Sequence, residues 1–296
     1  MASIFVQIAS YHDYELPRTI LDCMNKSSGE NIINFGVHLC YVKDDIFIPD
    51  LDNIKLKKSK APENIGVGPG RFIANSFYND EDYYLQIDSH TRFDKNWDLD
   101  LIESYSLYKS VGCDPVLSTY PGQYFYKDYE LQFYNQGVSY IEFNKDFSYD
   151  FKNNKILPQK MEFSDDGSIF IKSIAAGLVF GEGKISKFII DKNVFYWGEE
   201  TLMAINLFMA GYDLMIPKKQ VIYHLYYDHE DAPKNMRHLV WDDFPKEVDE
   251  QDMASRKYIL FTINNLIQGV YPEWSTRTFK DFEYYAGVDF DRGALE

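Results

Sequence analysis

The sequence contains few cysteines, no long hydrophobic run and too few basic residues to balance its acidic ones. Its three cysteines, Cys23, Cys40 and Cys113, are widely spaced and form no CxxC pair, which fits a reducing compartment, and the apolar runs around Cys23 and Cys40 indicate buried structural thiols there. No apolar run reaches the roughly 18 residues of a membrane helix, and residues 1–9 lack a basic segment, so we expect a soluble cytoplasmic chain without membrane contacts. The 46 acidic and 30 basic residues give a net charge of −16, which disfavours nucleic acid as a partner.

Hydrophobic and aromatic residues are abundant. They make up 45% and 17% of the 296 residues, enough for the core of one large α/β domain or of a domain with an appended lobe. This composition excludes a disordered chain. The 24 Tyr and 22 Phe suit a binding cleft, because tyrosine combines an apolar body with a polar tip.

Hydrophobic patterns divide the first 120 residues into alternating strands and helices. The predicted strands are residues 4–9, 34–41, 83–87 and 116–121, and the predicted helices start at 16, 72 and 97. This alternation predicts a mostly parallel sheet with right-handed crossovers. Residues 122–165 have no clean period and form either an antiparallel flap or a long loop over the site. Later elements are a helix at 202–208, a strand at 221–226 and two helices within 253–290.

The stretch around which the chain is organised is the short apolar strand that ends at Asp88. Ligands of open α/β sheets bind beyond the carboxyl ends of the strands, which is where Asp88 lies. Extended residues two apart point the same way, so Asp88 and His90 can converge on one cation. Oxygen and nitrogen ligands together favour Mn, Fe or Zn over Ca. The alternative is that Asp88 starts a turn and His90 caps the next helix.

A second cluster joins Trp197 and Gly198 to the acidic pair Glu199 and Glu200. It leads into an amphipathic helix that Gly211 is expected to end. Acidic residues in a first helical turn favour the helix dipole, which by itself explains one of the two glutamates. Two glutamates beside Trp and Gly also suit a ligand site, because glycine lets a ligand approach and tryptophan offers a stacking wall.

Five further features are weaker signals. His224 lies in an apolar strand and is a core histidine unless a metal needs a third ligand. His229 and the basic residues 57–60 are expected at the surface. Arg71 follows a glycine-rich turn, where a helix N-terminus could face a diphosphate. Residues 175–177 are small, as if another group approaches the backbone closely.

The order and spacing of Asp88-Ser89-His90, residues 197–200 and His224 resemble two related groups of retaining sugar-nucleotide transferases with the GT-A fold. One is the mucin-type polypeptide N-acetylgalactosaminyltransferases, whose metal motif is also Asp-Ser-His. The other is the cytosolic hydroxyproline N-acetylglucosaminyltransferase family, which modifies a ubiquitin-ligase adaptor. The second resemblance covers nearly the whole chain. Its fragments are residues 8–11, 16–20, 68–71, 83–93, 96–98, 176–178, 197–200, 211–213, 217–224, 277–279, 282–285 and 287–290.

The resemblance implies an α/β GT-A glycosyltransferase fold, a Rossmann-like and mostly parallel sheet flanked by helices. Residues 1–230 would form the catalytic domain. Within it, 1–120 is the expected nucleotide-binding half and 121–230 the expected half for the donor sugar and acceptor. Residues 231–296 would be a helical extension packed on the same domain.

The implied activity is metal-dependent transfer of a sugar, N-acetylglucosamine, from a UDP-sugar to a hydroxyl acceptor such as a hydroxyproline of a protein. Asp88, His90 and His224 would bind Mn²⁺ or Mg²⁺. Glu200, with its neighbour Glu199, matches the carboxylate near the sugar and the acceptor. The positions that the resemblance assigns to the nucleotide and donor are Ser10, Tyr11, Arg18, Arg71, Asp88, Ser89, Gly177 and Trp197.

The chain departs from the family pattern in three places. Gly70 replaces the usual alanine before Arg71, residues 217–224 are one longer than in the mucin-type enzymes, and residues 122–165 match poorly. The poor match leaves the acceptor open, with a glycan or a modified base as alternatives. Glucose or galactose is the alternative donor sugar, and a non-catalytic nucleotide-sugar-binding module or a metal hydrolase is the alternative function. Nothing in the sequence predicts the oligomeric state.

Overall fold

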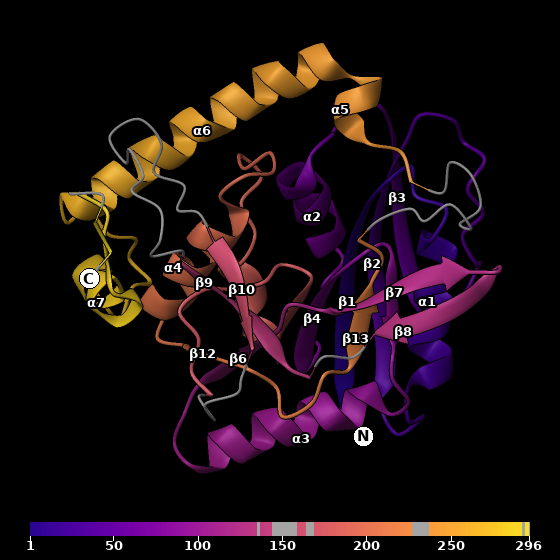
Figure 1. The fold of residues 1–296 in the computed structure, drawn as a ribbon, viewed down its shortest axis with the longest axis horizontal. Helices are drawn as coiled ribbons and strands as arrows, with labels where there is room; N and C mark the ends of the chain where they lie inside the picture. Colours follow the sequence, from indigo (N-terminus) through magenta and orange to yellow (C-terminus); the bar gives the residue numbers. More distant parts are fainter. Residues whose placement is uncertain (135–136, 144–158, 164–168, 227–236, 292–293, 296) are drawn as a thin grey trace.

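The computed structural model describes residues 1–134, 137–143, 159–163, 169–226, 237–291 and 294–295. Its centre is a seven-stranded sheet with the order β12-β6-β11-β4-β1-β2-β3 (Figure 1). β1 pairs in parallel with β2 and β4, whereas β11 is antiparallel to β4 and β6, so the predicted mostly parallel sheet is confirmed. The strands are β1 (Ser3–Tyr11), β2 (Ile32–Tyr41), β3 (Ile54–Lys60), β4 (Tyr83–Asp88), β6 (Pro115–Ser118), β11 (Leu178–Glu182) and β12 (Asp213–Met215).

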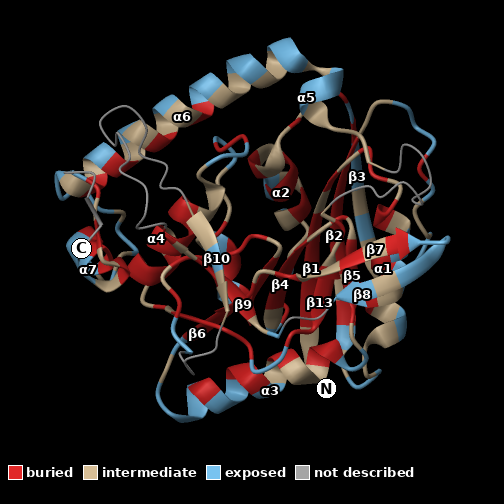
Figure 2. Ribbon diagram, in the orientation of Figure 1, coloured by how far each residue is buried: buried red, intermediate tan, exposed pale blue. Residues whose placement is uncertain are grey.

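Helices cover both faces of this sheet. Each face needs a cover, because successive apolar side chains along a strand point to opposite faces. Ile4, Val6 and Ile8 of β1 pack in one hydrophobic cluster with α1 and α3, whereas Phe5 packs in another with α4, α6 and α7. Figure 2 shows the central strands largely buried and the outer side of α6 exposed. The helices are α1 (Leu16–Lys26), α2 (Val67–Asn75), α3 (Trp97–Ser110), α4 (Glu199–Met209), α5 (Val240–Asp243), α6 (Pro245–Ile267), α7 (Phe279–Ala286) and the 3₁₀ helix η1 (Gly183–Lys187).

A smaller four-stranded sheet, with the order β5-β13-β7-β8, lies beside the end of β4. β13 is antiparallel to β5, and this pairing sets His224 opposite Thr91. The described part of residues 122–165 consists of antiparallel strands, which favours the flap over the long loop. The strands outside the central sheet are β5 (Thr91–Phe93), β7 (Gly122–Lys127), β8 (Glu130–Tyr134), β9 (Ser139–Phe143), β10 (Gln159–Phe163), β13 (Ile222–His224), β14 (Val288–Asp289) and β15 (Ala294–Leu295).

Some boundaries differ from those that the pattern predicts. The basic residues 57–60 belong to the edge strand β3, where exposed lysines discourage pairing with other chains. Helix α6 begins at Pro245, ahead of residue 253, because proline is favoured in a first helical turn. His229 lies outside the described residues. Across the part of the chain that the structure describes, no helix is both long and apolar enough to cross a membrane.

The glycine-rich N-terminus of α2 contacts the segment that leads into α4. The backbone N–H groups of Val67 and Gly68 donate to the carbonyl oxygens of Phe195 (2.8 Å) and Val194 (3.1 Å). A Cβ atom at Gly68 would lie 2.2 Å from the Val194 oxygen and 2.3 Å from that of Asp191. Glycine at this position therefore allows the close approach that places α2 beside the start of α4.

We expect Gly68→Ala to lower the free energy of unfolding by about 2 kcal/mol, because a clash with two backbone carbonyls outweighs the roughly 1 kcal/mol that alanine gains in a helix. Gly70→Ala is the matched control in the same helix. The atoms nearest to its Cβ would be Ala9 Cβ at 3.1 Å and His38 Nδ1 at 3.2 Å, both of them side-chain atoms. Its expected change is within about 1 kcal/mol. Urea denaturation of both variants measures the difference, and equal losses would contradict the argument.

Candidate functional site

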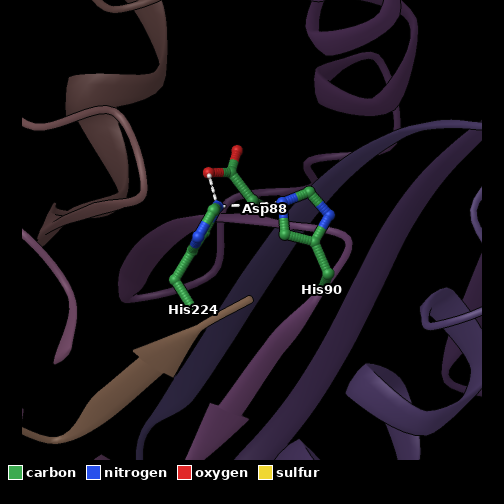
Figure 3. A group of neighbouring side chains, drawn as sticks. All are labelled: Asp88, His90 and His224. Carbon is green, nitrogen blue, oxygen red and sulfur yellow. Dashed lines mark hydrogen bonds and ion pairs between the residues drawn. The ribbon is translucent and has the colours of Figure 1, made fainter. Parts of the chain in front are cut away.

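Asp88, His90 and His224 meet at the end of β4 (Figure 3). One possible ligand atom from each lies within 4.8 Å of the other two. His224 Nε2 is 2.8 Å from His90 Nε2 and 3.3 Å from Asp88 Oδ2. The pairing of β13 with β5 brings His224 to this place from a segment far along the chain. His224 is therefore more than an ordinary core histidine, and His90 turns toward it from the loop after β4.

The donor set fits a divalent cation of the first transition row. A cation about 2.1 Å from each donor places neighbouring donors about 3 Å apart, close to the separations found here. Burial and the nearby His90 lower the pKa of His224 to about 4, which keeps its imidazole neutral. Burial opposes ionisation of Asp88, but its contacts with His224 and Arg71 outweigh burial and lower the pKa of its carboxyl group. The cluster thus offers a carboxylate oxygen of Asp88 and a nitrogen of the neutral His224 imidazole.

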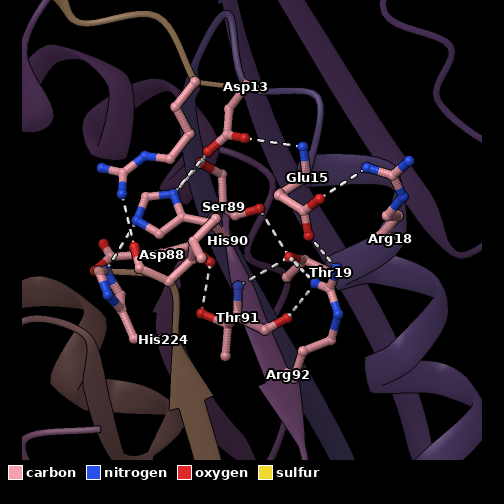
Figure 4. Close-up of polar contacts among 12 residues, drawn as sticks. Asp13, Glu15, Arg18, Thr19, Asp88, Ser89, His90, Thr91, Arg92 and His224 are labelled. Carbon is pink, nitrogen blue, oxygen red and sulfur yellow. Dashed lines mark hydrogen bonds and ion pairs between the residues drawn. The ribbon is translucent and has the colours of Figure 1, made fainter. Parts of the chain in front are cut away.

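A second carboxylate, Asp13, lies behind His90 (Figure 4). Its Oδ2 is 2.6 Å from His90 Nδ1 and accepts a hydrogen bond from Ser89 Oγ, while its Oδ1 accepts from the backbone N–H of Glu15. Burial would raise the pKa of Asp13, but His90 and the Glu15 N–H outweigh burial and lower it. No sequence motif singles out Asp13. The available signal was its position after β1, because parallel neighbours such as β1 and β4 end at the same sheet edge.

A pocket of about 920 Å³ opens beside the cluster. Its wall also contains aromatic residues that the sequence analysis did not single out. Tyr196 packs edge-on against Trp197 and Trp241, with ring centroids 5.3 and 5.8 Å apart, and Tyr226 stacks on Tyr120. The expected site residues that line the pocket are Arg71, Asp88, Gly177, Trp197, Glu199, Glu200 and His224.

Arg71 connects the metal cluster to the second acidic cluster. Its side chain is only 4% exposed, with Nη2 3.0 Å from Asp88 Oδ1 and Nη1 3.3 Å from Glu199 Oε1. Burial opposes its charge, but Glu199 and Asp88 outweigh burial and raise its pKa. Arg71 is therefore a fixed positive charge that ties α2, β4 and α4 together at the pocket.

Glu199 and Glu200 form the first turn of α4, directly after Gly198, which has a φ of 86°. Glu200 Oε1 accepts a hydrogen bond of 2.9 Å from the backbone N–H of Ala176. Burial raises the pKa of Glu200 to about 7 and also raises that of Glu199, although Arg71 opposes the shift of Glu199. The two neighbouring carboxyl groups therefore differ in their partners and can differ in their roles.

Gly177 borders Asp88 on the other side of the pocket. A Cβ atom there would lie 3.3 Å from Asp88 Oδ2 and 3.1 Å from Pro121 Cγ. Any side chain at this position would press on the carboxylate that faces His224. The small residues expected to allow a close approach thus border the candidate metal ligand.

Five expected residues do not line the pocket: the candidate metal ligand His90, whose contacts are given above, and four others. Ser10 is buried, and Tyr11 donates to Asp243 Oδ2 at 2.9 Å. Arg18 turns toward Glu15, whose Oε1 lies 2.7 Å from Arg18 Nη1, and Ser89 turns toward Asp13. The side chains of Tyr11, Arg18 and Ser89 are thus bound to partners within the protein, whereas Ser10 Oγ is buried without a hydrogen-bond partner among the described residues.

The family model described as Glycosyltransferase (GlcNAc) matches residues 48–292. The crystal structure of GalNAc-T7 with UDP, GalNAc and Mn²⁺ matches with a TM-score of 0.56 and 14% sequence identity, over 97% of this chain and 55% of that one. The chain thus spans about half the length of that structure, and the likeness confirms the GT-A fold. No curated protein sequence matches.

Proposed function

Because the chain belongs to the glycosyltransferase (GlcNAc) family, we propose that it transfers N-acetylglucosamine from UDP to a hydroxyl group, with retention at the anomeric carbon and dependence on a divalent cation. The observation that carries the proposal is the convergence of Asp88, His90 and His224 beside a pocket that also contains Glu199 and Glu200. The UDP and Mn²⁺ in the GalNAc-T7 structure support the choice of ligands. Mn²⁺ is the first cation to test and Mg²⁺ the second.

In this proposal Asp88, His90 and His224 hold the cation. A bound cation would supply positive charge to the departing diphosphate. Arg71 keeps Asp88 ionised and oriented through its 3.0 Å contact. Residues 1–120 would hold the nucleotide and 121–230 the sugar and acceptor, with 231–296 as the helical extension.

The remaining site residues have separate tasks. Glu200, fixed by the Ala176 N–H, stabilises positive charge on the sugar or orients the acceptor hydroxyl, and Glu199 fixes Arg71. Gly177 leaves room for the donor beside Asp88, and the exposed ring of Trp197 offers a stacking surface. For the uridine end we propose the edge formed by Ser10, Tyr11, Arg18 and Ser89.

A hydroxyproline of a protein is the first acceptor to test. A net charge of −16 disfavours nucleic acid, and the carboxylates of the pocket disfavour anionic acceptors in the same way. The aromatic wall formed by Tyr196, Trp197 and Trp241 suits a ring-shaped acceptor such as hydroxyproline or a sugar. Modified bases and other UDP-hexoses are the next candidates for the same assay.

The test is isothermal titration of the protein with UDP, with and without Mn²⁺ and after chelation. We expect UDP to bind at least about tenfold more tightly with Mn²⁺, because a cation held by the three ligands would supply positive charge that attracts the diphosphate. Uridine is the matched control ligand, since it lacks phosphate and its affinity should not respond to Mn²⁺. UDP binding that is weak and independent of Mn²⁺ would contradict the proposal. A positive result leads to transfer assays with individual UDP-sugars.

A further inference from the structure

We propose that Asp13 is a positioning residue for the metal site: it holds His90 in the orientation and tautomer that present Nε2 to the cation. The inference rests on the proposed function and deepens it. Asp13 belongs neither to the Asp-x-His motif nor to the ligand cluster. It lies in the connection between β1 and α1, which contains none of the three ligands.

The hydrogen bond between Asp13 and His90 selects the tautomer. Asp13 Oδ2 lies 2.6 Å from His90 Nδ1, and an ionised carboxylate can only accept. Nδ1 therefore carries a hydrogen, which leaves the lone pair of Nε2 as the one that His90 can offer to a cation. This Nε2 lies 2.8 Å from His224 Nε2, inside the ligand cluster. The opposite tautomer would place a hydrogen where the cation must bind.

Asp13 is itself held in place. Its side chain is almost completely buried, and it accepts hydrogen bonds of 2.8 Å from both the Glu15 N–H and Ser89 Oγ. The backbone of Asp13 is held as well, because it forms an isolated antiparallel β-bridge with the backbone of Arg237. These contacts leave the carboxylate little freedom to rotate, so it can fix the plane of the His90 ring.

Thr19 of α1 reinforces the same arrangement from the backbone (Figure 4). Its hydroxyl donates to the carbonyl oxygen of Ser89 at 2.7 Å and accepts from the N–H of Thr91 at 3.0 Å. The residues on both sides of His90 are thus bound to α1, the helix that directly follows the connection carrying Asp13. Backbone and ring are fixed by one segment, which is the arrangement expected of a support for a metal ligand.

The test compares Mn²⁺ affinity in Asp13→Asn and Asp13→Ala by isothermal titration. We expect Asp13→Ala to weaken Mn²⁺ binding about 10–100-fold, as for other outer-shell partners of metal-binding histidines. Asp13→Asn should weaken it less, because its amide oxygen can still accept from His90 Nδ1. Asp98→Asn is the matched control. Asp98 is also fully buried and accepts from Ser28 and Asn31, none of which belongs to the ligand cluster.

Visible spectra of the Co²⁺-loaded proteins provide a readout that a purely structural role would not change. The d–d bands depend on the ligand set, so they should change in Asp13→Ala and stay as in wild type in Asp98→Asn. If Asp13→Ala does not fold, Asp13→Asn carries the test. Wild-type Mn²⁺ affinity and Co²⁺ bands in the folded Asp13 variants would overturn the inference and leave the proposed function intact. Absence of Mn²⁺ binding in the wild type would overturn both.

Discussion

Replacing His224 with alanine is expected to lower kcat/KM for sugar transfer by at least about 10³-fold. The substitution removes one of three protein ligands, and stabilising the charge of a departing diphosphate with a bound cation contributes several kcal/mol to the transition state. A loss of about 4 kcal/mol corresponds to about 10³-fold in rate. The measurement is transfer and donor hydrolysis with UDP-N-acetylglucosamine and Mn²⁺. Both activities should fall together, because they share the departure of UDP.

The fold should tolerate this change. His224 Nδ1 is buried without a hydrogen-bond partner among the described residues. Replacing His224 with alanine therefore leaves no buried polar group unpaired at the Nδ1 side of the ring. His38→Ala is the matched control: His38 is also buried, bonds to Ser59 Oγ at 3.1 Å and does not line the pocket. We expect His38→Ala to lower the melting temperature while kcat/KM stays within a few-fold of wild type. Full transfer activity in His224→Ala would exclude the proposed metal site.

The parts of the fold that depend on local patterns could be predicted from the sequence. The apolar run before Asp88 forms β4 and ends at Asp88 itself, as expected from its composition. Helix α3 begins at Trp97 as predicted, and Gly211 follows α4 with a φ of 102°. In each case the signal lies within a few residues, so no distant contact was needed to find it.

Elements that depend on distant partners could not be predicted in this way. The apolar residues near Leu178 form β11, but its antiparallel insertion between β4 and β6 depends on pairing with both strands. The buried contacts of Glu15 with Arg92 and Tyr124 join three separate segments. Nothing in the local sequence around Glu15 indicates these partners, because each lies more than 70 positions away.

The candidate site also contains residues that a local pattern predicts and residues that only distant contacts bring together. Asp-x-His spacing predicted that Asp88 and His90 converge, whereas the place of His224 came from the resemblance and from no local pattern. Asp13 could not be predicted because its contact with His90 spans 77 positions. No local motif marks the carboxylate that follows β1. Of the aromatic wall, Trp197 was predicted, but its neighbours were missed for a related reason: Trp241 reaches Tyr196 only when the segment before α6 folds back over the pocket.

Replacing Glu200 with glutamine is expected to lower kcat by about 10²–10³-fold while UDP affinity changes little. Glu200 lines the pocket, and the Ala176 N–H fixes its carboxylate at 2.9 Å. A buried, fixed negative charge near the developing positive charge of the sugar acts mainly in the transition state, so its loss lowers kcat more than it raises KM. Glutamine keeps the size of the side chain and an oxygen that can accept from the Ala176 N–H. The variant therefore isolates the charge.

The pH profile separates this role from a structural one. Burial raises the pKa of Glu200 to about 7, so the carboxyl group is protonated below that pH and charged above it. A bound cation nearby lowers this pKa, so kcat/KM of the wild type should rise with pH through a midpoint at or below about 7. Glutamine does not ionise, and this rise should disappear in Glu200→Gln. Glu199→Gln is the matched comparison in the same helical turn: it loses the ion pair with Arg71 but should keep the rise. If Glu200→Gln retains wild-type kcat and the same profile, the charge of Glu200 takes no part in the reaction, and the acceptor must be oriented by another group in the pocket.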